Sequence, residues 1–208
     1  MDFTTETTVL FSGKSFDIRI VEDVDYLMDL VKTDDDVPFW AVLWPAALGM
    51  SEYFWENVSF TGKRALELGA GLGLVGIVAA AKCAAVVQTD FIPESLKLAQ
   101  ENAKANGISN ISYVLADWRN FCINDKFDWI IGSDILYEPR MHPFLKEIFK
   151  KNLSPEGTIA LADPGRDDAK KFIEELSCDG YRVETVVKEV FETGRKITVS
   201  LYFLKAQY

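Results

Sequence analysis

Residues 67–76 read ELGAGLGLVG and carry two glycine patterns laid over one another. Gly71, Gly73 and Gly76 match the dinucleotide-binding pattern G-x-G-x-x-G, yet the first five residues of the run are typical of a different cofactor loop. Glycines at 69, 71 and 73 let the backbone turn tightly out of a strand and approach a ligand where a Cβ would clash. A tight strand-to-helix turn needs glycine even without a ligand, so the loop alone is weak evidence for a cofactor.

Acidic positions add chemistry to the glycine loop, and each follows a short apolar run. Asp90 ends one run and can accept both hydroxyl protons of a ribose, which suits either kind of cofactor. Asp117 precedes Trp118, so a carboxylate for the exocyclic amine of adenine stands beside an indole surface for stacking. Ser133 and Asp134 end a further run. The order of these groups, each at a predicted strand end, favours a cofactor site over a bare turn.

The elements that must position these side chains alternate between strand-like and helix-like segments. Short apolar runs with β-branched or aromatic residues predict strands at 63–68, 85–90, 111–115, 127–133 and 157–162. Between them lie helix-like stretches at 74–82, 93–106 and 141–151. This alternation predicts an α/β fold with a mainly parallel sheet, right-handed crossovers and helices on both faces. Residues 181–191 and 196–204 alternate around Gly194, which predicts an antiparallel C-terminal hairpin.

The first 60 residues are expected to form a cap within the same domain as the core of residues 61–208. They contain a hairpin candidate at 11–16 (FSGKSF), an acidic stretch at 32–38 (KTDDDVP) and a helix candidate from Ala46 to Glu56. With 208 residues, 49% of them hydrophobic, the chain can bury one sizeable core. An acidic stretch is ordinarily a solvated loop, but this one borders the expected pocket and could attract a cationic substrate.

Composition narrows the classes of function. Acidic residues outnumber basic ones by 32 to 22 and the basic ones are scattered, which leaves no electrostatic footprint for nucleic acid. No apolar run approaches the roughly 18 residues that a membrane span needs, and the N-terminus lacks a signal-peptide pattern, so we expect a cytoplasmic protein without a membrane partner. The spacing of Cys83, Cys122, Cys178 and His142 predicts no metal site. We expect the cysteines to be packing residues and His142 to lie on a helix surface.

The layout argues against a nicotinamide dinucleotide fold, which usually begins with the glycine-bearing strand. With about 60 residues before that strand and an antiparallel end, it resembles the seven-stranded class I methyltransferase fold, which binds S-adenosylmethionine. Four stretches resemble methyltransferase family 16, the protein lysine methyltransferases. They are VPFWAVLWPAALGMSEYF (37–54), ALELGAGLGLVGIVAA (65–80), ADWRN (116–120) and SDILYE (133–138). The electron-transfer-flavoprotein β-subunit lysine methyltransferases are an especially similar type, and ADPGR (162–166) also resembles theirs.

The resemblance implies a role for each matching residue. It implies Trp44 in the wall of the cofactor pocket, Glu67, Gly69 and Gly71 around the methionine end, Asp90 at the ribose, Asp117 and Trp118 at the adenine, and Ser133 beside the sulfonium. The acid-x-x-aromatic signature of the family matches residues 134–137, which implies Asp134 and Tyr137 as catalytic residues. It is unlike the Asn/Asp-Pro-Pro-Tyr signature of amide and adenine methyltransferases, which argues against a DNA or glutamine target.

The expected function is S-adenosylmethionine-dependent N-methylation, with a lysine side chain of a protein as the acceptor. A lysine amine with an ordinary pKa of about 10.4 is mostly protonated at pH 7, so the site must desolvate it or remove its proton. Asp134 could hold the ammonium and orient the free amine, while Tyr137 walls the channel. Most of the acceleration would then come from proximity and orientation.

Three other functions remain open. A small-molecule amine methyltransferase, of the nicotinamide N-methylase kind, shares every cofactor residue and differs only in access to the pocket. A nicotinamide-dependent oxidoreductase is disfavoured by strand order and by Asp117 and Trp118. A non-catalytic binding module would combine an intact cofactor pocket with a closed acceptor site.

Some of these residues also have a purely structural interpretation. Trp40 and Trp44 lie in an apolar segment and could be core aromatics. Asp134 and Tyr137 could cap the following helix and pack beneath it. Residues 163–166 could form a simple turn with an exposed arginine, and the sequence leaves this as open as a functional role.

Overall fold

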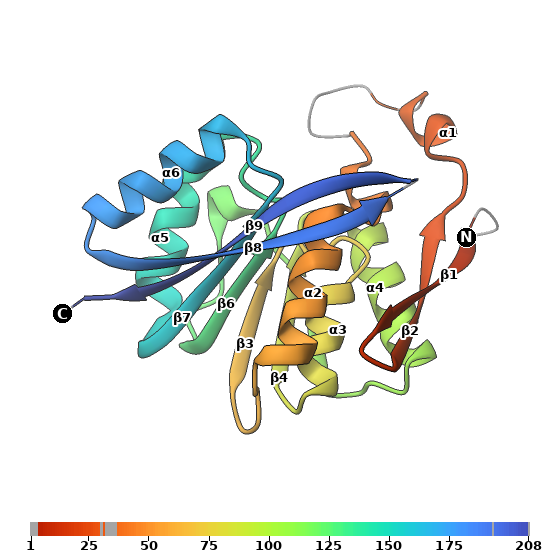
Figure 1. Ribbon diagram of the computed structural model, residues 1–208, viewed down its shortest axis with the longest axis horizontal. Coiled ribbons are helices and arrows are strands. Elements are labelled where there is room, and N and C mark those ends of the chain that lie inside the picture. Colours follow the sequence, from red (N-terminus) through yellow and green to blue (C-terminus); the bar gives the residue numbers. More distant parts are fainter. Residues whose placement is uncertain (1–3, 30, 32–36, 193, 208) are drawn as a thin grey trace.

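The computed structural model describes residues 4–29, 31, 37–192 and 194–207, and a seven-stranded sheet runs through its centre (Figure 1). The strands are β3 (Arg64–Leu68), β4 (Ala85–Asp90), β5 (Ile111–Leu115), β6 (Phe127–Ser133), β7 (Leu153–Asp163), β8 (Tyr181–Glu192) and β9 (Arg195–Ala206). Their order across the sheet is β5-β4-β3-β6-β7-β9-β8. β3 to β7 are mutually parallel, whereas β9 is antiparallel to both β7 and β8. This confirms the expected sheet.

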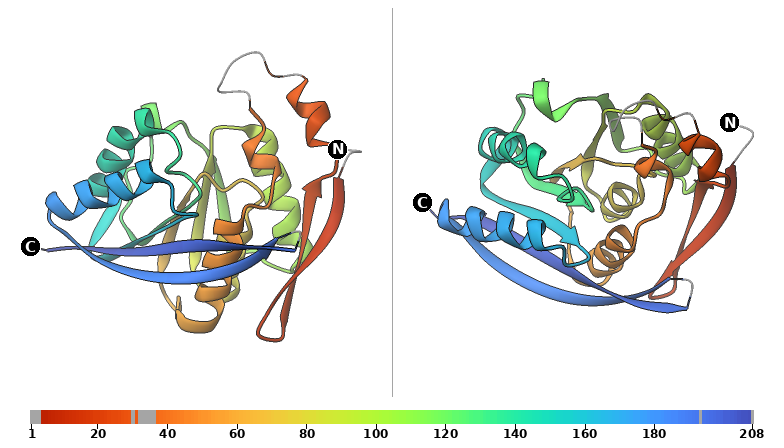
Figure 2. Two further views of the ribbon diagram at one scale, coloured as in Figure 1. Left: turned by 45° about the horizontal axis from the view of Figure 1, so that its top comes forward. Right: turned by 90° about the horizontal axis from the view of Figure 1, so that it is seen from above.

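Five helices cover the two faces of the sheet, as the alternating pattern predicts (Figure 2). α2 (Pro45–Asn57), α3 (Leu74–Ala81) and α4 (Pro93–Ala105) lie on one face, and α5 (His142–Asn152) and α6 (Asp167–Cys178) lie on the other. The apolar side chains accordingly separate into two buried clusters, one on each side of the sheet. Proline at the first position favours the start of α2 and α4, because its fixed φ suits a helix and its missing N–H would have no partner there.

Two elements of the core differ from the sequence analysis. α6 was not predicted, although Ala169, Phe172, Ile173 and Leu176 are buried at the spacing of one helix face. β7 begins at Leu153 instead of 157, and its pairing with β6 shifts register between Phe127 and Trp129. Short apolar runs locate the buried centre of such a strand and leave its ends undefined.

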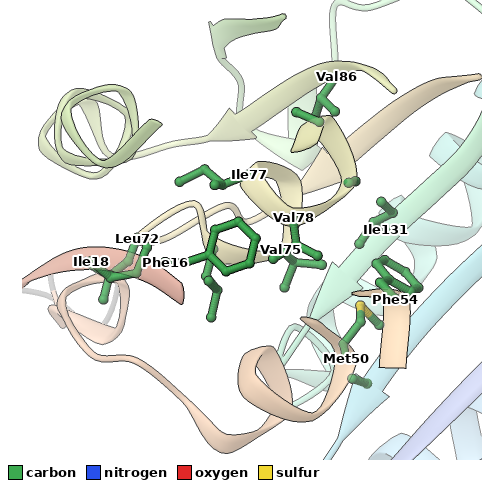
Figure 3. Close-up of a cluster of buried hydrophobic side chains, with 14 of the residues drawn as sticks. Phe16, Ile18, Met50, Phe54, Leu72, Val75, Ile77, Val78, Val86 and Ile131 are labelled. Carbon is green, nitrogen blue, oxygen red and sulfur yellow. The ribbon is translucent and has the colours of Figure 1, made fainter. Parts of the chain in front are cut away.

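The N-terminal segment forms a two-stranded hairpin, β1 (Thr4–Phe11) and β2 (Lys14–Val21), followed by the short helices α1 (Val24–Met28) and η2 (Phe39–Ala41). The hairpin and α2 confirm the two elements expected there. Phe16 and Ile18 of β2 belong to the same buried cluster as Leu72 and Val75 of the core (Figure 3). The division into a cap of 1–60 and a core of 61–208 stays a prediction, and the acidic stretch of residues 32–36 lies outside the described residues.

Asn102 of α4 and Asn106, the residue that caps the end of this helix, form hydrogen bonds with the backbone of β2. Asn106 accepts from Asp17 N at 3.0 Å and donates to Asp17 O at 2.8 Å. Asn102 accepts from Arg19 N at 2.8 Å and donates to Arg19 O at 3.2 Å. Four helical residues rise about 6 Å and two strand residues about 6.6 Å, so the two spacings match. Asn102 also donates to Leu72 O at 2.9 Å, which ties the hairpin to the glycine loop.

Candidate active site

A cavity of about 650 Å³ opens at the carboxyl ends of β3, β4, β5 and β6. The strand order reverses between β3 and β6, which is where open α/β sheets bind ligands. The volume lies within the range of roughly 300–1,000 Å³ that is usual for small-molecule sites. Of the residues to which the resemblance assigns a role, those that line the cavity are Trp44, Gly69, Gly71, Asp90, Asp117, Trp118, Ser133, Asp134 and Tyr137. Glu67 is not among them.

The glycine loop after β3 forms one wall of the cavity. Gly69, Gly71 and Gly73 have φ values of 63°, 52° and 84°, a left-handed backbone that side chains with a Cβ rarely adopt. A Cβ at Gly69 would also lie 3.0 Å from Ile135 Cγ2. The loop is fastened to the next strand by Ala70 N, which donates to Thr89 O at 2.9 Å. Backbone shape therefore explains these three glycines.

Gly76, the last glycine of the dinucleotide pattern, has a different explanation. It lies inside α3, and a Cβ there would stand only 2.3 Å from Glu67 Oε2 and 2.5 Å from Gln88 Nε2. Glu67 is fully buried behind the loop and accepts from Gln88 Nε2 at 2.7 Å. Burial raises the pKa of Glu67 to about 7, against the opposing effect of hydrogen bonds from Gln88 and from the Gly76 backbone. The glycine thus makes room for a buried carboxylate, and Glu67 supports the loop from beneath.

Asp90 at the end of β4 is 5% exposed and faces the cavity. Its Oδ2 accepts from Gly71 N at 3.0 Å and its Oδ1 from Ile92 N at 3.0 Å. Burial raises the pKa of Asp90, while these backbone donors oppose the rise. A carboxylate has about four acceptor sites, more than Gly71 N and Ile92 N occupy, so the group has the chemistry to hold a ribose diol.

Asp117 and Trp118 follow β5 and also line the cavity. Asp117 caps the short helix η3 (Trp118–Asn120) by accepting from Arg119 N at 2.8 Å. Its carboxylate also pairs with the Arg119 guanidinium, with Oδ2 to Nη2 at 2.6 Å, which lowers the pKa of Asp117. Trp118 lies over the glycine loop, because its Cζ2 would be 3.4 Å from a Cβ at Gly69. The sequence did not indicate the pairing with Arg119, which also lines the cavity.

The other wall is the turn that follows β6, where Ser133 and Asp134 line the cavity. Asp134 has a φ of 59°, and its N–H donates to Ala162 O at 2.8 Å. Its side chain is 6% exposed, and burial raises its pKa. The residues at the caps of the next two helices are Glu138 and Met141, so capping by Asp134 does not explain this position. Asp134 Oδ2 is buried and has no hydrogen-bond partner among the described residues.

Arg166, at the end of the turn at 163–166, closes this wall. Its Nη1 lies 2.5 Å from Asp134 Oδ1 and 2.8 Å from Asp163 Oδ2, and its side chain lines the cavity. Asp163 is fully buried. The turn thus places a partly exposed arginine between two buried carboxylates at the cavity. Residue order alone could not place Asp134 and Arg166, 32 positions apart, in contact.

Aromatic side chains form the rim of the cavity. Tyr137 packs edge to face on Phe39, with ring centres 5.3 Å apart, and the ring centres of Phe39 and Trp44 are 6.2 Å apart. Trp44 donates from Nε1 to Phe39 O at 2.7 Å. Burial raises the pKa of Tyr137 to about 12, which keeps its hydroxyl neutral at physiological pH. Trp40 lines the cavity and also packs against the core.

Two expectations about individual residues were wrong. His142 is 8% exposed, packs against Phe172 with ring centres 4.2 Å apart, and has Nε2 3.1 Å from Leu136 O. It is buried because its ring is covered by Phe172 of α6 and by the loop before α5, which carries Leu136. Cys83, Cys122 and Cys178 are exposed and free instead of packed.

In the described part of the chain, no helix has the length and apolarity that crossing a bilayer requires.

Comparison with known proteins gives this arrangement a family. Residues 32–179 match the family described as lysine methyltransferase. EEF1A lysine methyltransferase 3 of Mus musculus is 33% identical over 156 residues, which cover 72% of this chain and 67% of that protein. Protein-lysine methyltransferase METTL21E of Mus musculus is 35% identical over 177 residues, which cover 76% of this chain and 66% of that protein.

A solved structure supports the fold. The N-methyltransferase NodS from Bradyrhizobium japonicum WM9, in complex with S-adenosyl-L-homocysteine, has a TM-score of 0.62 and 18% identity, covering 86% of this chain and 97% of that one. The cavity fits S-adenosylmethionine on its own chemistry, with a glycine cradle, a buried acceptor at Asp90 and an indole at Trp118. The chain therefore belongs to the lysine methyltransferase family, as a class I methyltransferase that uses S-adenosylmethionine.

Proposed function

We propose that the protein methylates lysine side chains of a protein substrate. The observation that carries this proposal is Asp134, a buried carboxylate in the cavity wall whose Oδ2 has no partner among the described residues. Leaving a buried acceptor unpaired typically costs about 1–3 kcal/mol, and such a cost is most easily understood where a ligand supplies the missing donor. An amine or ammonium nitrogen supplies it.

The residues divide the work by position. We assign the ribose to Asp90, the adenine to Asp117 and Trp118, and the methionine end to Gly69, Gly71 and Ser133, with Glu67 supporting the loop and Trp44 in the wall. S-adenosylmethionine supplies a methyl group on a cationic sulfonium, and the new N–C bond forms as the S–C bond breaks. The nitrogen must first lose its extra proton to solvent, because only a neutral amine has the lone pair to attack.

Asp134 and Tyr137 are the proposed catalytic residues. Asp134 receives the ammonium through its unpaired oxygen and keeps the amine oriented after the proton has left. Tyr137 stays neutral over the working pH range and, with Phe39, walls the approach to the cavity. Orientation of this kind can supply up to roughly 7–11 kcal/mol in favourable cases, and no covalent enzyme intermediate is required.

The named relatives support a protein substrate, and no observation favours a small amine of the nicotinamide type. Incubation with isotopically labelled S-adenosylmethionine, and with either a cell lysate or its metabolite pool, tests this choice. We expect label in protein, with mass spectrometry mapping the methyl groups to lysine. Methylation of histidine or arginine would overturn the lysine assignment, and label confined to the metabolite pool would overturn the protein substrate.

The proposed setting is the cytoplasm, without nucleic acid as a partner. Three free cysteines in the described residues agree with a reducing compartment, and the formal net charge of −10 disfavours a polyanion. Cell fractionation with immunodetection tests the location, and recovery in a secreted or membrane fraction would contradict it.

A further inference from the structure

One nitrogen of Arg166 contacts two carboxylates, those of Asp134 and Asp163, at the cavity wall that follows β6. Nη1 lies 2.5 Å from Asp134 Oδ1 and 2.8 Å from Asp163 Oδ2. The contact occupies Oδ1 of Asp134, while Oδ2 stays buried without a partner among the described residues. Arg166 thereby distinguishes the two oxygens of the proposed catalytic carboxylate.

The turn after β7 holds Arg166 in this position. Asp163 is fully buried, and its Oδ1 accepts from both Gly165 N and Arg166 N at 2.7 Å. Gly165 has a φ of 95°, which completes the tight turn. On the other side, the Asp134 N–H is bound to Ala162 O. Both ends of the Arg166–Asp134 contact are thus fixed by backbone hydrogen bonds, and the arginine is not a loose surface side chain.

Arg166 affects the protonation of Asp134 through its charge. The charged groups that act on Asp134 are Arg166 and Asp163. Tyr137 lies on the same loop as Asp134, and the charges of Asp90 and Glu138 act on Tyr137 as well. Burial and Asp163 raise the pKa of Asp134, and Arg166 opposes both. Without the guanidinium, two neighbouring buried carboxylates would repel each other, and one would take up a proton more readily.

We propose that Arg166 is a positioning residue for the methyl acceptor, which holds Oδ1 so that Asp134 stays ionised and offers Oδ2 to the nitrogen. Its positive charge beside the same carboxylate also favours the neutral amine over the ammonium, since a nearby like charge disfavours the protonated form. The inference rests on the proposed function, because it assigns Arg166 a part in receiving an amine. With a neutral residue at 166, both the ionisation of Asp134 and the deprotonation of the amine need a higher pH. The two effects therefore shift the pH dependence of turnover in the same direction.

The test compares pH profiles of turnover at saturating cofactor, on a lysine-bearing substrate mapped by mass spectrometry. We expect Arg166→Met to lose up to about 100-fold at pH 7 and to recover part of that loss at pH 9, because its acidic limb moves upward. Arg166→Lys keeps the charge and should keep the wild-type limb. Arg182→Met, at an exposed position of β8, serves as the control and should change neither rate nor profile. An unmoved limb in Arg166→Met would overturn the proposal.

A second measurement needs no substrate. ¹³C NMR of labelled aspartate follows the Asp134 carboxyl, with its signal identified from Asp134→Asn, and we expect the pKa of Asp134 to be higher in Arg166→Met than in the wild type. If Arg166→Met does not fold, Arg166→Gln takes its place, with the same expected direction. A wild-type enzyme that makes no methyllysine would contradict the proposed function alone, whereas an unchanged Asp134 titration would contradict the role of Arg166.

Discussion

Asp90 and Asp134 stand on two walls of one cavity, and both are buried aspartates whose pKa burial raises. Asp90 is held by backbone donors, Gly71 N and Ile92 N, one on each oxygen. Asp134 is held through one oxygen by a side chain, Arg166. Both oxygens of Asp90, on the side proposed for the cofactor, thus have a protein donor before any ligand binds. Asp134, on the side proposed for the methyl acceptor, keeps one oxygen without a donor among the described residues. Changes in the first should alter binding and stability, and changes in the second should alter turnover.

The largest effect is expected from Asp134→Asn. Asn tolerates the φ of 59° that Ala does not, so this variant removes the charge without straining the turn. We expect turnover to fall by roughly 10²–10⁴-fold, as for loss of a positioned acid or base, with cofactor affinity within a few-fold of wild type. Rate measurements and calorimetry on the same preparation check both halves. An Asn variant that methylates at near wild-type rate would remove the difference between the two walls.

The next effect concerns the carboxylate beneath the glycine loop and its dependence on pH. The pKa of Glu67 is raised from 4.5 to about 7, so the folded state binds a proton that the unfolded state releases between these values. Wild-type stability should therefore fall as pH rises through this window and level off above about 7. The difference between 4.5 and 7 corresponds to up to about 3 kcal/mol, at about 1.4 kcal/mol for each pH unit.

Glu67→Gln isolates that contribution, because the amide does not titrate. Relative to the wild type, the variant should gain stability between pH 5 and pH 8, as measured by the free energy of unfolding in urea. Parallel curves for the two proteins across this range would show that Glu67 does not titrate there.

Asp90→Ala should weaken cofactor binding by about 1.5–3 kcal/mol, the usual value of hydrogen bonds to a charged group. It also removes the acceptor of Gly71 N, so part of the loss comes from a looser loop. Asp90→Asn keeps an acceptor for that N–H and should lose less. Calorimetric titration with S-adenosylhomocysteine gives both dissociation constants, and equal affinities in wild type and Asp90→Ala would refute the assignment of Asp90 to the ribose.

The smallest expected effect is on stability, from Gly76→Ala. A methyl group there would stand 2.3 Å from Glu67 Oε2, and such overpacking costs about 1–3 kcal/mol, reduced by the roughly 1 kcal/mol that Ala gains over Gly in a helix. Gly49→Ala in α2 is the matched control, since its nearest contact is the side chain of Val190 at 3.2 Å. Thermal denaturation should show a lower midpoint for Gly76→Ala than for Gly49→Ala. The reverse order would exclude close packing as the reason for Gly76.

The sequence by itself determined the frame of this protein. Short apolar runs located the parallel strands β3 to β7, because helices cover both faces of the sheet, and alternation located β8 and β9. Helix-like stretches located the helices from α2 to α5. The apolar residues 169, 172, 173 and 176 of α6 have the same helical spacing, so the sequence also indicates this helix. The glycine loop and the acids at strand ends could be predicted as one site, because parallel strands present their carboxyl ends on the same edge.

Tertiary structure alone decided which of these groups touch. Gly76 matches a dinucleotide pattern in the sequence, but its Cβ is excluded by Glu67 and Gln88, which meet it from two different strands. His142 was expected outside and lies inside, since the path of the chain before α5 sets which side of its first turn is covered. The contact between Arg166 and Asp134 joins the ends of β6 and β7, and such distances depend on strand register and backbone turns, which have no signature in the order of residues.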